Sequence, residues 1–375
     1  MKIRILHLQL LPLLSGVQRF SLHLLKGLPQ DRYEIYVASA QGGPFVDEVK
    51  AQGWNYLPIR SFKHQISPSD LLSFIEIWHY CRKYQFDIVH TNSSKPGLLG
   101  RIAAYLAGIP LIVHSIHGTA FQPHQSKAVY RLYVSLEKLG NFFSDYTIFV
   151  NHSDRLLCLK MGLLPSSKAL TIYNAMPPED TPALFRTRKS SKDFIIGSTI
   201  RFSNQKNVIN LIIAACRACQ AQPNLKFIIL GDGEHYPLCK SIVASHRLND
   251  RILLPGWDSD VNPWLTVFDA FILYSRWEAM PYSIIEAMHA GLPIIGSAIP
   301  SIQELVDDTV GWVVALDDPD ALISTFLKVA SSVGTARQKG DLAHQKVKSL
   351  CDYPTMISSY RRVYEGGSLA IKGRD

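Results

Sequence analysis

The 375-residue sequence lacks any apolar run long enough to cross a membrane. Its longest runs, such as those at 211–215 and 227–230, fall far short of the ~20 residues that a spanning helix needs. It also lacks low-complexity segments and repeats of solenoid period, which excludes fibrous and repeat architectures. With 47% hydrophobic and 19% charged residues, the chain is typical of a globular protein with buried sheets.

Cysteine is scarce, and the six cysteines lie far apart along the chain. Only Cys216 and Cys219 have the spacing of a redox or metal site, and no second Cys or His pair completes a zinc site. Both fall in an apolar helical pattern, so we expect them to pack in a core. No G-x-G-x-x-G follows the first apolar segment, which argues against a dinucleotide-dependent oxidoreductase.

Negative charge is in deficit, because 39 Lys and Arg face 31 Asp and Glu, a net charge of +8. This excess favours anionic partners such as nucleotides, phosphorylated lipids or a negative membrane surface. Nucleic-acid binding would rest on charge alone, and we expect none. The first residues, MKIRILHLQLLPLLSG, resemble a signal peptide, but they alternate like a strand and no small-x-small cleavage site follows. We therefore predict a buried first strand and a cytoplasmic protein.

Strand-like and helix-like segments alternate along both halves of the chain, which is typical of βαβ units and parallel sheets. We predict an N-terminal α/β domain at 1–172, a polar, proline-rich linker at 173–192 and a second α/β domain at 193–351. The edges of the two sheets would face a central cleft. The tail, 352–375, has helical spacing, and it either crosses back to the first domain or closes the second.

The segment SRWEAMPYSIIEAMHAG, residues 275–291, keeps two carboxylates in apolar surroundings. The pattern predicts a strand end, a loop with Glu278, and a helix that has Pro281 at its first position, contains Glu286 and is closed by Gly291. Such carboxylates can accept hydrogen bonds from the hydroxyls of a sugar nucleotide, Glu278 from the sugar and Glu286 from the ribose. The alternatives are a solvated loop carboxylate at Glu278 and a helix residue near the positive dipole end at Glu286.

Two cations precede another predicted helix of the second domain. Arg201 and Lys206 lie in the polar turn GSTIRFSNQK, after a strand and just before the helix that begins near Asn207. A helix N-terminus with two cations favours an anion, although a solvated loop is the preferred interpretation of this segment by itself. The glycines of Gly231-Asp-Gly233 suit a tight turn at a sheet edge and are only a weak indication of phosphate binding.

Taken together, these motifs resemble retaining glycosyltransferases of family 4 (group 1), in the branch that builds bacterial surface polysaccharides. The family motif, Glu, seven residues, Glu, then Ala-Met and a Gly-Leu-Pro turn, is intact from Glu278 to Pro293. Ile172-Tyr-Asn174 and Asp87-Ile-Val-His90 match further family positions. The resemblance implies a GT-B fold of two Rossmann-like domains.

The resemblance also implies roles for particular residues. The side chains implied in catalysis are His117, Glu278, Arg201 and Lys206. Donor binding is assigned to Gly16, Arg201, Lys206, Glu278, Met280, Tyr282, Ser283 and Glu286. His117 and Asn92 are assigned to the acceptor side, where Asn92 replaces a histidine that is common in this branch. Ala279 and Pro281 also depart from the common pattern, and Pro281 lacks an N–H that could bind the sugar.

The implied reaction moves a sugar from a UDP- or GDP-linked donor to a hydroxyl of a lipid-linked glycan, with retention of configuration. Two side-chain cations would neutralise the diphosphate, so we expect no metal and no cofactor besides the nucleotide-sugar substrate. Residues 119–146 form an amphipathic, aromatic-rich segment that either packs on the first sheet or rests on an anionic membrane surface. Two alternatives are a non-hydrolysing sugar-nucleotide epimerase of the same fold and a non-catalytic nucleotide-sugar binding protein.

Overall fold

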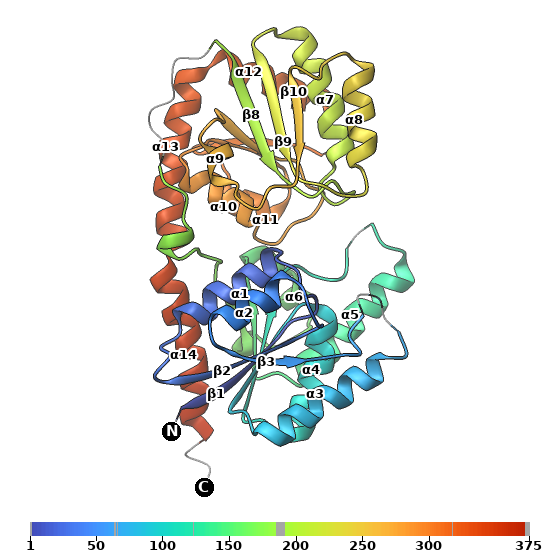
Figure 1. Cartoon of the computed structure of the whole chain (residues 1–375), viewed down its shortest axis with the longest axis vertical. Helices are drawn as coiled ribbons and strands as arrows, with labels where there is room; N and C mark the ends of the chain where they lie inside the picture. The colour runs from blue at the N-terminus through green and yellow to red at the C-terminus, as the bar shows by residue number, and fades with distance from the viewer. Residues whose placement is uncertain are drawn as a thin grey trace. The chain divides into compact units, whose positions relative to one another are not determined.

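The computed structural model of the chain describes residues 2–63, 65, 67–122, 124–184, 192–316 and 318–371 (Figure 1). The chain forms two compact units, the first from Met1–Pro177 with Tyr353–Asp375 and the second from Pro178–Asp352. Parts of two predicted segments, 185–191 of the linker and 372–375 of the terminal helix, lie outside the described residues. Each unit is a parallel sheet covered by helices.

The first unit contains a seven-stranded parallel sheet in the order β3-β2-β1-β4-β5-β6-β7. Its strands are β1 (Ile3–Leu8), β2 (Tyr33–Ser39), β3 (Asn55–Pro58), β4 (Ile88–Asn92), β5 (Leu111–Ile116), β6 (Tyr146–Phe149) and β7 (Ala169–Thr171). Its helices are α1 (Gly16–Gly27), α2 (Pro44–Ala51), α3 (Asp70–Tyr84), α4 (Ser94–Ala107), α5 (Lys127–Phe142), α6 (His152–Lys160) and, from the end of the chain, α14 (Tyr353–Ile371).

The second unit contains a six-stranded parallel sheet in the order β10-β9-β8-β11-β12-β13. Its strands are β8 (Phe194–Thr199), β9 (Leu225–Leu230), β10 (Ile252–Gly256), β11 (Ala270–Leu273), β12 (Ile294–Ser297) and β13 (Gly311–Val314). Its helices are α7 (Val208–Ala221), α8 (Tyr236–Ser245), α9 (Asn262–Leu265), α10 (Tyr282–His289), α11 (Pro300–Leu305), α12 (Pro319–Ser331) and α13 (Val333–Leu350).

The strands are short apolar segments because both faces of a parallel sheet are covered by helices. The residues at 3–8 form β1, which lies inside the sheet between β2 and β4, so the predicted first strand is confirmed. Two edge strands, β7 and β13, were not predicted from the sequence. Each has only three or four residues, too few for a clear pattern.

The six cysteines are free thiols buried in the cores of the two units. Cys216 and Cys219 both lie on α7 with no exposed surface, which confirms their predicted packing role. Burial raises the pKa of both thiols, to about 11 and about 12, so they are protonated at neutral pH. Among the helices that the structure describes, none is both long enough and apolar enough to span a membrane.

Helix α14 packs in the first unit although it follows the second unit in the sequence (Figure 1). Its Tyr360 and Tyr364 are fully buried. The Tyr364 hydroxyl lies 2.6 Å from His90 Nδ1, and the Tyr360 hydroxyl lies 3.3 Å from Ser115 Oγ. Hydrogen bonds from the terminal helix therefore reach both central strands β4 and β5.

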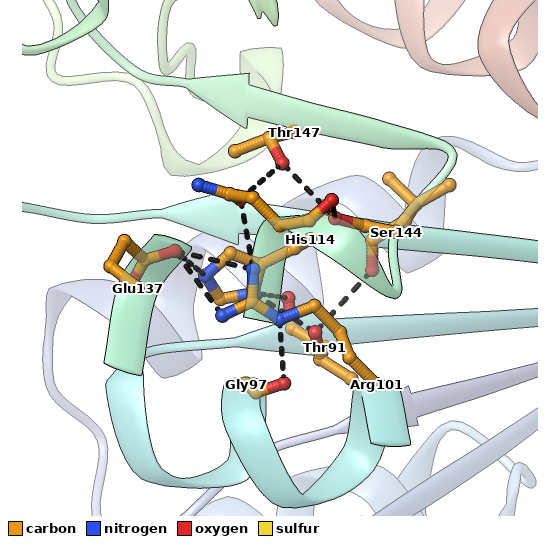
Figure 2. A network of polar contacts seen from close by, with 9 residues as sticks. Thr91, Gly97, Arg101, His114, Glu137, Ser144 and Thr147 are labelled. Atoms are coloured by element: carbon orange, nitrogen blue, oxygen red, sulfur yellow. Dashed lines mark hydrogen bonds and ion pairs between the residues drawn. The ribbon is translucent and has the colours of Figure 1, made fainter. Parts of the chain in front are cut away.

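A second polar network lies between the sheet and helices α4 and α5 of the first unit (Figure 2). Arg101 of α4 is fully buried and donates to Glu137 Oε1 at 3.2 Å, to Asn141 Oδ1 at 3.0 Å and to the carbonyl of Gly97 at 2.8 Å. Gly140 makes room for this guanidinium, because a Cβ there would lie 2.2 Å from Arg101 Nη2. The Arg101–Glu137 ion pair therefore holds α5 against α4.

The same network reaches the sheet through a histidine (Figure 2). His114 Nδ1 of β5 lies 2.9 Å from Thr91 Oγ1 of β4, and its Nε2 lies 4.0 Å from Glu137 Oε1. Burial lowers the pKa of His114 well below its ordinary value, so the ring is neutral and Arg101 is the cation that balances Glu137.

Removal of one partner of the Arg101–Glu137 pair should destabilise the first unit strongly. Glu137→Ala leaves a buried guanidinium without its carboxylate, so we expect a loss of about 3–5 kcal/mol in the free energy of unfolding. Urea denaturation measures this free energy of unfolding, and hydrogen exchange of the backbone amides shows whether the loss falls in the first unit. Lys138→Ala, at an exposed position on the same helix, is the matched control and should change stability by less than about 0.5 kcal/mol. A loss from Glu137→Ala as small as the control's would contradict the assigned role of the pair.

Candidate functional site

Two loops of the second unit meet where neighbouring strands end. The first loop, 200–207, follows β8, and the second, 274–281, follows β11, which pairs with β8 in parallel. The backbone N–H of Arg276 donates to the Gln205 carbonyl at 2.8 Å, and Gln205 Nε2 donates to the Trp277 carbonyl at 3.0 Å. These hydrogen bonds hold the loops with the predicted cations and carboxylate side by side.

Lys206 and Glu278, one from each loop, form an ion pair. The Lys206 side chain is 17% exposed and that of Glu278 only 8%. Glu278 is therefore not a solvated loop carboxylate, which was one alternative from the sequence. The ammonium group has three N–H donors and the carboxylate two oxygens, so both groups keep capacity for a ligand while they remain paired.

Arg201 lies in the first loop, immediately after β8. Its side chain is exposed and forms no ion pair with any residue that the structure describes. The Gly231-Asp-Gly233 turn packs against this loop, since a Cβ at Gly231, with φ +129°, would lie 1.8 Å from the Ile200 carbonyl oxygen. The glycine makes room for the backbone of the loop that carries Arg201, a role that the sequence did not reveal.

Helix α10 begins where the second loop ends. Pro281 is the residue before the helix rather than its first residue, because its backbone is extended with ψ 121° and only its carbonyl joins the first turn. Met280 and Tyr282 are buried beside it, and Ser283 is half-buried in the first turn. Gly291, with φ +80°, follows the helix and terminates it as predicted.

Glu286 lies on the second turn of α10 and is only 5% exposed. Its neighbours Ile285 and Ala287 have no exposed surface at all. A carboxylate in such apolar surroundings is retained when other groups interact with it. The predicted residues of the second domain thus lie on two loops and on the first two turns of one helix. They are Arg201, Lys206, Glu278, Met280, Tyr282, Ser283 and Glu286.

The first unit holds the other predicted residues. Asn92 ends β4, and His117 follows the end of the neighbouring strand β5. Asn92 Oδ1 lies 2.9 Å from His117 Nε2, so the structure brings these two residues into direct contact. Burial lowers the pKa of His117 to about 3, which keeps the ring neutral at physiological pH.

Gly16 lies at the same edge of the first sheet. It is the exposed first residue of α1, the helix that follows the central strand β1. Phe20, one turn further along α1, packs against the His117 ring with a centroid distance of 4.6 Å. Phe20 was not predicted as a site residue, because one phenylalanine in an amphipathic helix is indistinguishable from ordinary core.

Comparison with known proteins identifies the family of the chain. A family model described as Glycosyltransferase Family 4 matches residues 14–180, and one described as Glycosyl transferases group 1 matches residues 180–341. The chain is 34% identical to the UDP-Gal:alpha-D-GlcNAc-diphosphoundecaprenol alpha-1,3-galactosyltransferase of Escherichia coli, over 88% of each chain.

Solved structures share the fold. The crystal structure of HepE from Anabaena with UDP and glucose matches with a TM-score of 0.82 at 18% identity, over 97% of this chain and 99% of that one. The two parallel-sheet units have the fold of GT-B glycosyltransferases, as predicted. The chain belongs to glycosyltransferase family 4, the glycosyl transferases group 1, and is a hexosyltransferase.

The energetic coupling between Lys206 and Glu278 can be measured directly. We expect a double-mutant cycle of Lys206→Ala and Glu278→Ala to give a coupling free energy of about 1–2 kcal/mol in unfolding, because the pair is largely shielded from water. The exposed pair Lys346–Asp307 of the same unit is the matched control and should couple by less than about 1 kcal/mol. Equal coupling in the two pairs would show that burial adds nothing at Lys206.

Proposed function

We propose that this enzyme transfers galactose from UDP-galactose, with retention of configuration, to a hydroxyl of a lipid-linked diphosphate sugar in bacterial surface-polysaccharide synthesis. The observation that carries the proposal is the 34% identity to a galactosyltransferase whose name specifies that donor and a diphosphoundecaprenol acceptor. The two chains match over 88% of their lengths, which includes both units.

The second unit supplies the groups that bind the donor in this proposal. The diphosphate lies against Arg201, Lys206 and the first turn of α10, where the backbone N–H groups of a helix have no intrahelical acceptor. Glu286 accepts hydrogen bonds from the ribose hydroxyls. Glu278 keeps Oε1 on Lys206 and accepts a sugar hydroxyl with Oε2, so the ion pair orients both groups toward one ligand.

The difficult step is departure of the diphosphate while positive charge develops at the sugar. In the proposed step the bond between C1 and the phosphate oxygen breaks, and the acceptor hydroxyl oxygen bonds to C1 on the same face. Its proton passes to the departing phosphate oxygen, which has just gained the electron pair of the broken bond. Arg201 and Lys206 stabilise that charge, a role that two side-chain cations can perform without a metal.

Activity of single variants tests the assignment. Lys206→Ala and Glu286→Ala should each lower kcat/KM by roughly 10²–10³-fold, the usual weight of a group that stabilises the leaving charge or orients the donor. Lys240→Ala and Asp341→Ala change exposed residues of the same unit and should leave activity unchanged. Near-normal turnover of Lys206→Ala would count against a role in catalysis.

The substrates are identified by product analysis with purified enzyme. UDP-galactose, UDP-glucose and GDP-mannose are offered with a synthetic N-acetylglucosaminyl-diphosphate lipid, and anomeric configuration is read by NMR. We expect an α-galactoside only with UDP-galactose. A changed sugar nucleotide formed without acceptor would instead identify an epimerase, and binding without any product would identify a non-catalytic protein.

A second observation favours docking of the first unit on an anionic membrane. Helix α5 exposes an apolar stripe whose members, Val129, Leu132, Leu139 and Phe142, are 41%, 51%, 46% and 72% exposed. Residues of a helix are about 100° apart, so these four share one face, opposite buried Glu137. The exposed cations Lys127, Arg131 and Lys138 lie along one side of the stripe.

The patch continues onto α4. Tyr105, which is 55% exposed, lies 5.1 Å from the Phe143 ring, and Phe143 lies 5.2 Å from the ring of Phe142. An exposed apolar stripe with basic flanks is the pattern of a helix that lies in a membrane interface. An enzyme docked in this way on the membrane would reach a lipid-linked acceptor.

Vesicle co-sedimentation tests the docking face. Wild-type protein should bind phosphatidylglycerol vesicles in a salt-sensitive manner and bind phosphatidylcholine vesicles weakly, because each basic residue contributes about 1 kcal/mol near an anionic surface. Leu132→Ser with Phe142→Ser should reduce binding at least tenfold. Leu342→Ser, an equally exposed leucine of the second unit, is the control. Unchanged binding of the double variant would place the contact elsewhere.

A further inference from the structure

The orientation of the Asn92 amide is fixed by a strand on its other side. Asn92 is fully buried, and its Nδ2 donates to the Leu8 carbonyl of β1 at 3.3 Å. A carbonyl oxygen only accepts hydrogen bonds, so the nitrogen of the amide must face β1. The amide oxygen then faces β5.

That orientation determines which nitrogen of His117 carries the proton. His117 Nε2 lies 2.9 Å from Asn92 Oδ1, which can only accept, so Nε2 is protonated and donates. In a neutral imidazole the other nitrogen, Nδ1, then has a free lone pair. Nδ1 forms no hydrogen bond with any residue that the structure describes, and the His117 side chain is half-buried rather than enclosed.

The surrounding groups keep the ring neutral and in place. The titratable side chains around His117 are His7 on β1, His90 on β4 and His114 on β5, and burial lowers the pKa of all three, so none supplies a charge near neutral pH. The Phe20 ring covers one side of the imidazole.

Strands β4 and β5 are also held together by side chains two residues before the Asn92–His117 contact. His90 and Ser115 each precede a contact residue by two positions, so they lie on the same face of the sheet as Asn92 and His117. His90 Nε2 lies 2.8 Å from Ser115 Oγ, and its Nδ1 lies 2.6 Å from the Tyr364 hydroxyl of α14.

We propose that Asn92 is a positioning residue, which holds His117 in the Nε2–H tautomer so that Nδ1 accepts a hydrogen bond from a substrate hydroxyl. His117 then acts as a neutral acceptor and not as a general acid. The identity of that hydroxyl, on the transferred sugar or on the acceptor, rests on the proposed function, but the tautomer does not.

The chemistry of the side chain explains why asparagine suits this position. A histidine at 92 could donate or accept at either ring nitrogen and would leave the tautomer of His117 undetermined. The Asn92 amide has one donor side, which the Leu8 carbonyl occupies, and one acceptor side, which His117 occupies. Asparagine at this position therefore gives His117 a defined hydrogen-bond acceptor.

NMR of the wild-type protein tests the tautomer without any substrate. Protein labelled with ¹⁵N-histidine is recorded from pH 8 to pH 5, and the His117 signals are assigned as those lost in His117→Gln. We expect a neutral ring with Nε2 protonated across this range. An Nδ1–H tautomer, or titration of His117 between pH 8 and pH 5, would overturn the proposal whether or not the protein transfers galactose.

Kinetics of Asn92 variants test the consequence. Asn92→Leu keeps the shape but removes the acceptor, so Nδ1–H becomes populated and kcat should fall about tenfold, the usual weight of one hydrogen bond. Asn92→Asp places a carboxylate on Nε2–H and raises the pKa of His117. Because a protonated ring cannot accept, activity should then be lost as the pH falls through that raised pKa, where wild-type activity has no such limb.

The rates of donor hydrolysis and of sugar transfer in the Asn92 variants locate the hydroxyl that His117 binds. Equal losses in acceptor-independent UDP-galactose hydrolysis and in transfer place the hydroxyl on the transferred sugar, and a loss in transfer alone places it on the acceptor. Asn249→Asp, an exposed position of the second unit, is the control and should keep the wild-type pH profile. Folded Asn92→Leu and Asn92→Asp with wild-type kcat and pH profile would refute the proposal.

Discussion

Hydrogen bonds between parallel strands place β8 beside β11 and β4 beside β5, with the carboxyl ends of each pair at one edge of a sheet. Every candidate residue lies at the carboxyl end of a strand, in the loop that follows it or on the next helix. The loop after β8 brings Lys206 to Glu278 across a separation of 72 residues. The ends of β4 and β5 bring Asn92 to His117 across 25 residues. The arrangement of the candidate residues in both units depends on this pairing.

Polar groups are concentrated around β4 and β5, the strands of the first unit that position the candidate residues Asn92 and His117. One face of β4 and β5 is bonded to α14 through His90 and Ser115. On the other face, His114 of β5 lies 4.0 Å from Glu137 of α5, which pairs with Arg101 of α4 (Figure 2). Buried polar networks are costly unless their members are paired, but when paired they specify one arrangement. The position of His117 is thereby fixed from both faces of the sheet.

The ion pair of the second unit has a related function. Lys206 and Glu278 satisfy each other while the protein is free of ligand, which avoids a half-buried charge without a partner. Each retains hydrogen-bonding capacity, so the proposed binding of the donor would need little rearrangement. Preorganised charges of this kind stabilise a transition state without the cost of reorientation during the reaction.

The sequence by itself determined the two α/β halves, the central strand β1 and the motif from Glu278 to Gly291, because hydrophobic periodicity and turn residues are local properties. It also indicated His117 and Asn92 separately. Only the tertiary structure decided that Asn92 Oδ1 meets His117 Nε2, that Glu278 is paired rather than solvated, and that α14 returns to the first unit. These contacts join residues far apart in the chain, and no local pattern records which partners strand pairing will bring together.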